Sequence, residues 1–169
     1  MREQVEQLNS GIEGTILNYL STNAVVRVLS LRQDLSSAFN RLLHSPVDTP
    51  VKVQFSDKYV LMFVRGRNLK TKKAILLLKT AAGQGVNNFR IEVNGANQAG
   101  FAVDPQMGGL WSKDVLAAFA GGVFGEREHT LSVKNAGDLA PAVLPPGDVS
   151  ALDSSKLLDV ILYVEYQLA

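Results

Sequence analysis

The stretch that decides the fold runs from Phe55 to Thr80 and reads FSDKYVLMFVRGRNLKTKKAILLLKT. Two apolar runs, Tyr59–Val64 and Ala74–Leu78, lie on either side of a polar turn that contains Gly66. Each run has the length of a buried strand and is too short for a core helix. The stretch therefore predicts two strands joined by a turn.

Similar strand patterns occur on both sides of this stretch. Apolar and polar residues alternate in several short segments, which is typical of strands with one buried face. The second run extends to a strand at Leu69–Leu78, and further strands are predicted at Val51–Phe55, Phe89–Val93, Gln98–Val103, His129–Lys134 and Leu157–Leu168. The pair Asn94-Gly95 predicts a tight hairpin turn between two of them. The last run is strongly apolar, so we expect it inside a sheet and not at its edge.

The first part of the chain has a different pattern. Apolar residues recur at intervals of three and four between Glu3 and Leu20, which predicts a helix. A short strand is predicted at Ala24–Leu31 from its β-branched residues. Asp34 is expected to cap a second helix that ends near His44, before two prolines.

The segment Asp104–Gly125 is open to two interpretations. Ser112 could cap a short helix that ends at Gly121-Gly122, or the segment could be a loop lying over the sheet. The stretch Gly137–Asp148 is rich in proline and is expected to be an irregular exposed loop.

The pattern as a whole predicts a mainly β fold. Several short strands separated by turns, without regular alternation of strand and helix, favour an antiparallel β-sandwich of the jelly-roll-like kind. We place this sandwich at residues 51–169 and an N-terminal helical arm with a short strand at residues 1–50.

Size and composition exclude several classes of protein. The chain has 169 residues, of which 46% are hydrophobic, so one core can form without metal or disulfides. The absence of cysteine excludes disulfides, thiolate zinc sites and thiol nucleophiles. No signal peptide is visible at the N-terminus. The apolar runs are shorter than the roughly twenty residues of a membrane-spanning helix, so no such segment is predicted. The compartment in which the protein works stays unknown.

Positive charge is concentrated in one region, although the net charge is only +1. The basic residues between Val51 and Lys79 are opposed only by Asp57. A basic region and an acidic C-terminal part can attract protein partners or other copies of the chain. Aromatic residues are not interleaved with the bases, which argues against nucleic acid. The candidate partner-binding residues are Arg65, Arg67, Lys70, Lys72, Lys73 and Trp111.

Three of these candidates have simpler structural interpretations. Lysines at 70 and 72 can be the solvated side of an exposed strand, where alternation would place them on one face. Trp111 can fill the end of the core, or it can anchor a protein or stack on a sugar ring.

Catalytic chemistry has little support. Only His44 and His129 are available as imidazole bases, and no Gly-x-Ser-x-Gly elbow occurs. His129 follows Glu126-Arg127-Glu128, which is more simply a charged turn before a strand than a metal or acid-base cluster. The sequence predicts no enzyme, no metal site and no cofactor.

The order of features resembles a known family. The run Val28-Leu29-Ser30-Leu31, a helix with Phe39, the Arg65-Gly66-Arg67 pair before an apolar strand, and the closing Leu158–Tyr166 are similar to the C-terminal region of the A subunits of bacterial Tc (ABC-type) insecticidal toxin complexes. This resemblance covers about a third of the residues, at both ends of the chain.

The resemblance implies a function without chemistry. In that family the region is an antiparallel β-sandwich that follows a long helical channel and docks the B–C subunit, with several copies in a ring. It implies a protein-docking and assembly module, secreted as part of a toxin complex and acting in virulence. The alternatives are a carbohydrate-binding, lectin-like sandwich in which Trp111 and a tyrosine stack on sugar, and a hydrolase that depends on His129.

Overall fold

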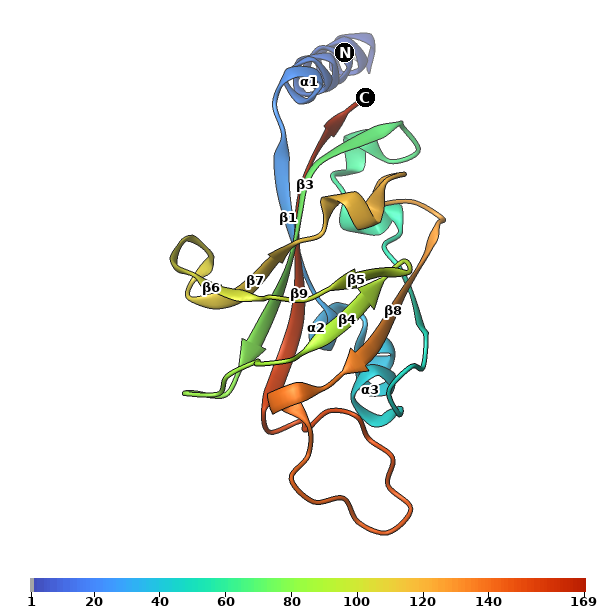
Figure 1. The fold of residues 1–169 in the computed structure, drawn as a ribbon. Helices are drawn as coiled ribbons and strands as arrows, with labels where there is room; N and C mark the ends of the chain where they lie inside the picture. The colour runs from blue at the N-terminus through green and yellow to red at the C-terminus, as the bar shows by residue number, and fades with distance from the viewer. Residues whose placement is uncertain (1) are drawn as a thin grey trace.

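Two antiparallel β-sheets face each other in the computed structural model, which describes residues 2–169 (Figure 1). The first sheet has the strand order β1-β9-β3-β7-β6, and the second has the order β2-β8-β4-β5. The strands are β1 (Val25–Ser30), β2 (Val51–Gln54), β3 (Leu69–Thr80), β4 (Arg90–Val93), β5 (Ala96–Gln98), β6 (Ala102–Asp104), β7 (Leu110–Asp114), β8 (Glu128–Asn135) and β9 (Leu157–Leu168). The predicted mainly β class is confirmed.

Buried side chains of the facing strands build one core between the two sheets. In β3, Leu76 and Leu78 point into this core, and Ile91 of β4 and Leu131 of β8 meet them from the second sheet. A side chain buried from both sides in this way contributes about 2 kcal/mol through the area it removes from water. The predicted antiparallel sandwich therefore has its hydrophobic core between the layers.

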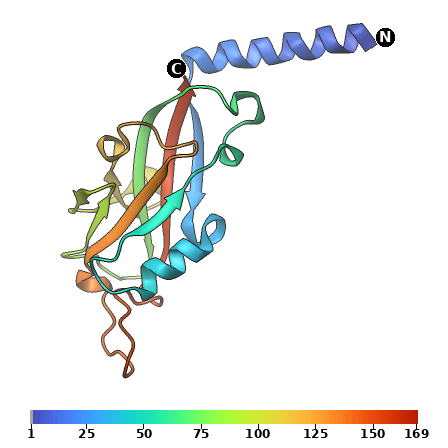
Figure 2. The same cartoon turned by 90° about the vertical axis from the view of Figure 1, so that its right-hand side faces the viewer.

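Three α-helices occur along the N-terminal part of the chain, which is where the sequence predicts helix: α1 (Arg2–Thr22), α2 (Leu31–Asp34) and α3 (Ser36–His44). α1 projects away from the sandwich, and its base lies beside the C-terminal end of β9 (Figure 2). There Leu20 is buried in a small second cluster with Val60, Val64 and Tyr166. β1, which follows α1, pairs with β9 from Val25 to Ser30.

β9 is the strand on which the first sheet is built. It lies between β1 and β3 and pairs with both, so its predicted interior position is confirmed. The pairing of β3 with β9 shifts register between Thr71 and Lys73. Lys72 is therefore the extra residue of a β-bulge, which bends the start of β3.

The hairpin predicted at Asn94-Gly95 is confirmed. Both residues have positive φ (50° and 80°), as a two-residue turn of type I′ requires. The strand predicted at Gln98–Val103 is wrong in its extent. β5 is shorter and ends at Gln98, and the chain then crosses to the first sheet, where Val103 pairs with Trp111.

Two other local predictions are corrected by the structure. The run Tyr59–Val64 is not a strand, because it forms two 3-10 turns that bury Tyr59, Val60 and Val64. Asp34 does not cap α3. Its carboxylate accepts the Ser30 backbone N–H (2.9 Å), and the Ser30 side chain caps α2.

The segment that was open to two interpretations contains a strand as well as a helical turn. Ser112 lies within β7 and caps nothing, and the helix is a 3-10 turn at Leu116–Phe119. Asp114, at the end of β7, accepts the Leu116 N–H at 2.9 Å just before this turn.

Candidate functional site

The basic residues of the candidate site lie at the base of α1. Arg65 and Arg67 stand in the turn before β3, and Arg67 Nη2 lies 3.5 Å from Glu13 Oε1 of α1. Arg65 donates to the Lys58 carbonyl (3.3 Å), and the Gly66 N–H donates to the Asp57 carboxylate (3.0 Å). These contacts hold the turn against the projecting helix.

The three lysines occupy the start of β3, and all are exposed. Lys70 stands opposite Gln167 and Lys73 opposite Glu165, while Lys72 is the bulged residue. The bulge interrupts the alternation that was expected to place Lys70 and Lys72 on one face. We call Arg65, Arg67, Lys70, Lys72 and Lys73 the basic group.

Trp111 lies in another part of the molecule. It stands opposite Leu78 in β7, and its partly buried ring packs against the main core. Leu78 lies six residue steps after Lys72 along β3, which corresponds to about 20 Å at the rise of a strand. The structure therefore does not unite Trp111 with the basic group in one site.

Two hollows meet at Trp111. One has a volume of about 480 Å³ and is lined by Phe89, Phe101 and polar side chains of neighbouring loops. The other has about 400 Å³ and lies towards Gly83, Gln84 and Leu110. None of their lining residues is a tyrosine, so the predicted Trp–Tyr platform does not form in these hollows. Sequence reasoning missed the two phenylalanines because distant segments bring them together.

His129 is a buried structural residue in β8, with only 1% of its surface exposed. Nε2 lies 2.8 Å from the Val123 carbonyl and Nδ1 lies 3.0 Å from Asn94 Nδ2. Because the amide nitrogen can only donate and the carbonyl can only accept, the imidazole is neutral with its proton on Nε2. Burial lowers the pKa of His129, and the charge of Arg127 lowers it further, against the effect of the Val123 carbonyl.

His44 takes part in a chain of contacts with Ser150 and Asp148. His44 Nδ1 lies 3.1 Å from Ser150 Oγ, which donates to Asp148 Oδ1 at 2.6 Å. The bonds from Ser150 lower the pKa of Asp148. In a catalytic triad the histidine stands between the serine and the acid. Here the serine stands between the other two, so the arrangement fixes a loop and does not activate a nucleophile.

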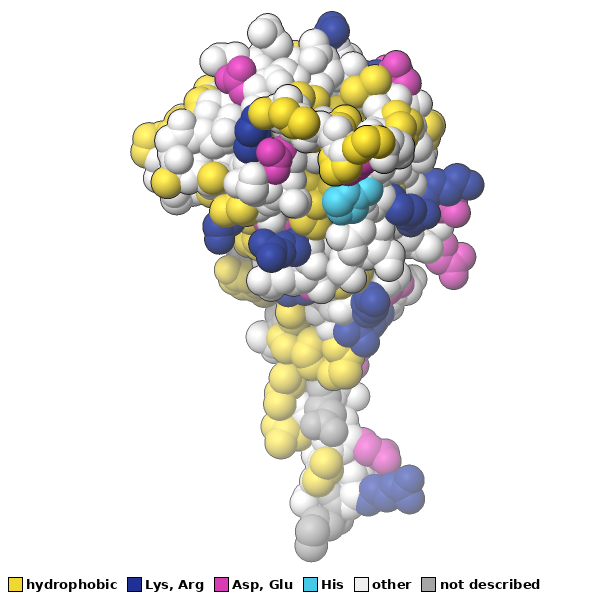
Figure 3. Space-filling model, turned by 90° about the horizontal axis from the view of Figure 1, so that it is seen from below, with side chains coloured by type: hydrophobic (Ala, Val, Ile, Leu, Met, Phe, Trp, Pro, Cys, Tyr) yellow, Lys and Arg dark blue, Asp and Glu magenta, His cyan; other side chains and the backbone are white. Residues whose placement is uncertain are grey.

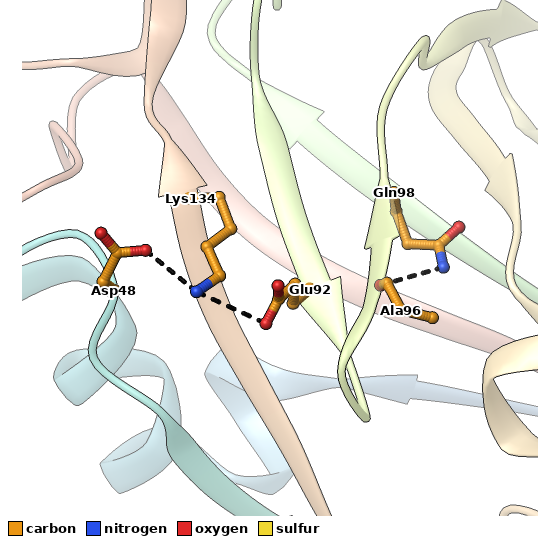
Figure 4. Close-up of polar contacts among 5 residues, drawn as sticks. All are labelled: Asp48, Glu92, Ala96, Gln98 and Lys134. Carbon is orange, nitrogen blue, oxygen red and sulfur yellow. Dashed lines mark hydrogen bonds and ion pairs between the residues drawn. The ribbon is translucent and has the colours of Figure 1, made fainter.

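A charged cluster on the second sheet is also structural. Lys134 Nζ lies 2.9 Å from Asp48 Oδ1 and 3.5 Å from Glu92 Oε2 (Figure 4). The hydrogen bond to Asp48 raises the pKa of Lys134. Near this cluster, the Gln98 side-chain amide donates to the Ala96 carbonyl at 3.2 Å. This hydrogen bond lies within β5. The lysine joins the loop before β2 to the face of β4 and β8.

Comparison of the chain with family models, curated proteins and solved structures gives no match. Among residues 2–169, no three potential metal ligands come together. None of the helices in this described part has the length and apolar character that crossing a membrane would require.

Proposed function

We propose that this chain is a non-catalytic docking and assembly module, similar to the C-terminal region of Tc toxin A subunits that binds the B–C subunit. The observation that carries the proposal is the apolar stripe on the projecting helix α1. The stripe consists of Val5, Leu8, Ile12 and Tyr19, which are 52%, 64%, 48% and 58% exposed.

This stripe needs a partner to be buried. Its residues are spaced by three, four and seven, which is the spacing of a coiled-coil seam. Hydrophobic side chains follow one side of the helix in Figure 3, where α1 is the distant part at the bottom. Most of the stability of a helix in a protein comes from packing of its apolar face, so a neighbouring helix would stabilise α1. The family resemblance supports the same helix of another copy as that neighbour.

We expect Ile12→Glu to reduce self-association of the full chain by at least tenfold, because it places a charge in the middle of the stripe. Analytical ultracentrifugation over a range of concentrations measures this. Ser10→Glu is the matched control, since residue 10 lies on the opposite side of α1. A wild-type chain that stays monomeric at every concentration, or an Ile12→Glu chain that associates as before, would contradict assembly through α1.

The basic group gives the module a second contact surface. The Arg67–Glu13 ion pair connects the basic group to α1. A partner that binds at the base of the helix would therefore also contact these positive charges. Exposed positive charges raise the association rate of an acidic partner, and salt weakens this effect. The corresponding partner is a Tc B-subunit-like protein with an acidic docking surface.

We expect Arg65→Glu/Lys70→Glu/Lys72→Glu to weaken binding to a purified Tc B–C subunit by at least tenfold, mainly through a slower association rate. Arg67 is left in place because it pairs with Glu13. Biolayer interferometry at two salt concentrations measures both rates, and Lys79→Glu at the other end of β3 is the control. Equal loss in the control, or binding that is insensitive to salt and to the triple variant, would refute a docking role for the basic group.

A further inference from the structure

We propose that the hollow beside Trp111 is a carbohydrate-binding site, which takes one sugar ring over its aromatic floor and continues along the second hollow. This site lies on another part of the sandwich from the docking surfaces, so it is a further function.

The floor of the hollow is aromatic. Phe89 and Phe101 are largely buried, and their ring centroids lie 5.6 Å apart with the rings tilted by 53°. The partly exposed Trp111 closes one side. The C–H bonds of a sugar ring carry partial positive charge and match the negative face of an aromatic ring. The part of these rings that faces the hollow, mainly that of the partly exposed Trp111, therefore fits the apolar face of a pyranose.

The rim is polar and has unused hydrogen-bonding groups. It is formed by the side chains of Asn87, Asn88, Arg90 and Asn135. Of these, only Asn135 makes a side-chain hydrogen bond within residues 2–169, in which its Oδ1 accepts the Gly137 N–H at 2.9 Å. Carboxamides both donate and accept, as adjacent sugar hydroxyls do. No carboxylate lines the hollow, so a basic peptide finds no charge partner there.

The backbone of the rim is fixed before any ligand binds. The Asn87 N–H donates to the Asp138 carboxylate at 3.0 Å, and the Asn87 carbonyl accepts the Asp138 N–H at 3.1 Å. The Phe89 N–H closes a turn onto the Val86 carbonyl, and Asn88 is held at a positive φ of 61°. A rim that is already ordered loses little entropy when a ligand binds.

The two hollows suggest the size of the ligand. Together they have room for more than one sugar ring, and Trp111 is the wall that they share. The second hollow is bordered by small residues of the Ala81–Gly85 turn and by the Thr80 side chain. An oligosaccharide that passes Trp111 would contact both hollows, whereas a single sugar would occupy only the first. The site is therefore expected to prefer oligosaccharides over monosaccharides.

The test uses the full chain on a glycan array of neutral and sialylated oligosaccharides with chitin fragments, followed by isothermal titration of the strongest binder. We expect Trp111→Ala to weaken binding at least tenfold and Trp111→Phe to retain part of it. Arg90→Gln is the second variant, because this exposed side chain makes no hydrogen bond or ion pair within residues 2–169, and its loss should weaken binding without affecting the fold.

Tyr163→Ala is the matched control, since this aromatic residue lies in the same sheet but on the other face, opposite Ile75. Circular dichroism and thermal unfolding accompany each variant. No glycan retained by the wild type overturns the proposal. Binding that is unchanged in both Trp111→Ala and Arg90→Gln, or that is lost equally in Tyr163→Ala, also overturns it.

Discussion

Replacing Gly137 with alanine is expected to destabilise the fold by about 3 kcal/mol or more. Gly137 has a φ of +53° and stands against the loop that forms the rim of the Trp111 hollow. A Cβ atom there would lie 2.1 Å from the Asn87 carbonyl oxygen and 2.8 Å from the Phe89 nitrogen. These atoms belong to the backbone and cannot rotate away, so the loop or the strand end must move. Urea unfolding followed by Trp111 fluorescence measures the loss.

Gly83→Ala separates the steric clash from the cost of the backbone angle. Gly83 also has a positive φ (73°), but a Cβ atom there meets nothing within 4 Å. We expect this variant to lose only about 1 kcal/mol. An equal loss of stability in both variants would mean that the close approach at Gly137 has no energetic consequence. It would also contradict the claim that the rim of the hollow is rigid.

The elements that the sequence predicts correctly are those determined by local sequence patterns. β9 is strongly apolar over most of its length, and Asn94-Gly95 has the residue types of a tight hairpin turn, so both are visible without tertiary contacts. The run Tyr59–Val64 misleads because buried 3-10 turns need apolar residues as much as a strand does. β7 is missed because Leu110–Asp114 lacks a clear alternation, and its pairing with β3 decides its conformation.

The candidate sites also differ in how far local sequence predicts them. The basic group lies close together in the sequence, so its location on one surface could be predicted. The hollow at Trp111 is made by four separate segments, around Asn88, Phe101, Trp111 and Asn135. Only the sheet topology brings these together, and the crossing of the chain from β5 to β6 is not visible in any local pattern. Exposure of α1 likewise depends on the tertiary structure and not on its periodicity.

His129→Ala is expected to lower the free energy of unfolding by about 3 kcal/mol. The imidazole packs between Phe55 and Phe119, with ring centroids at 5.8 Å and 4.8 Å. Its removal leaves a cavity and also leaves the Val123 carbonyl without its donor. His44→Ala is the control, because His44 lies at the end of α3 and is exposed. Its expected loss is below about 1 kcal/mol.

The pH dependence of stability identifies His129 more specifically than the size of the loss. Burial keeps the pKa of His129 in the folded protein below its usual value, so the unfolded chain binds a proton first as the pH falls. The stabilising contribution is thus complete above a pH of about 6.5 and is lost as the pH falls through the folded pKa, by at most about 1.4 kcal/mol per pH unit. Protonation would place an N–H at Nδ1 against the donating Asn94 amide. Urea unfolding between pH 8 and pH 5 should show this loss in the wild type and in His44→Ala but not in His129→Ala. If His129→Ala kept the same acid dependence, another group would be responsible and the neutral buried imidazole would be the wrong assignment.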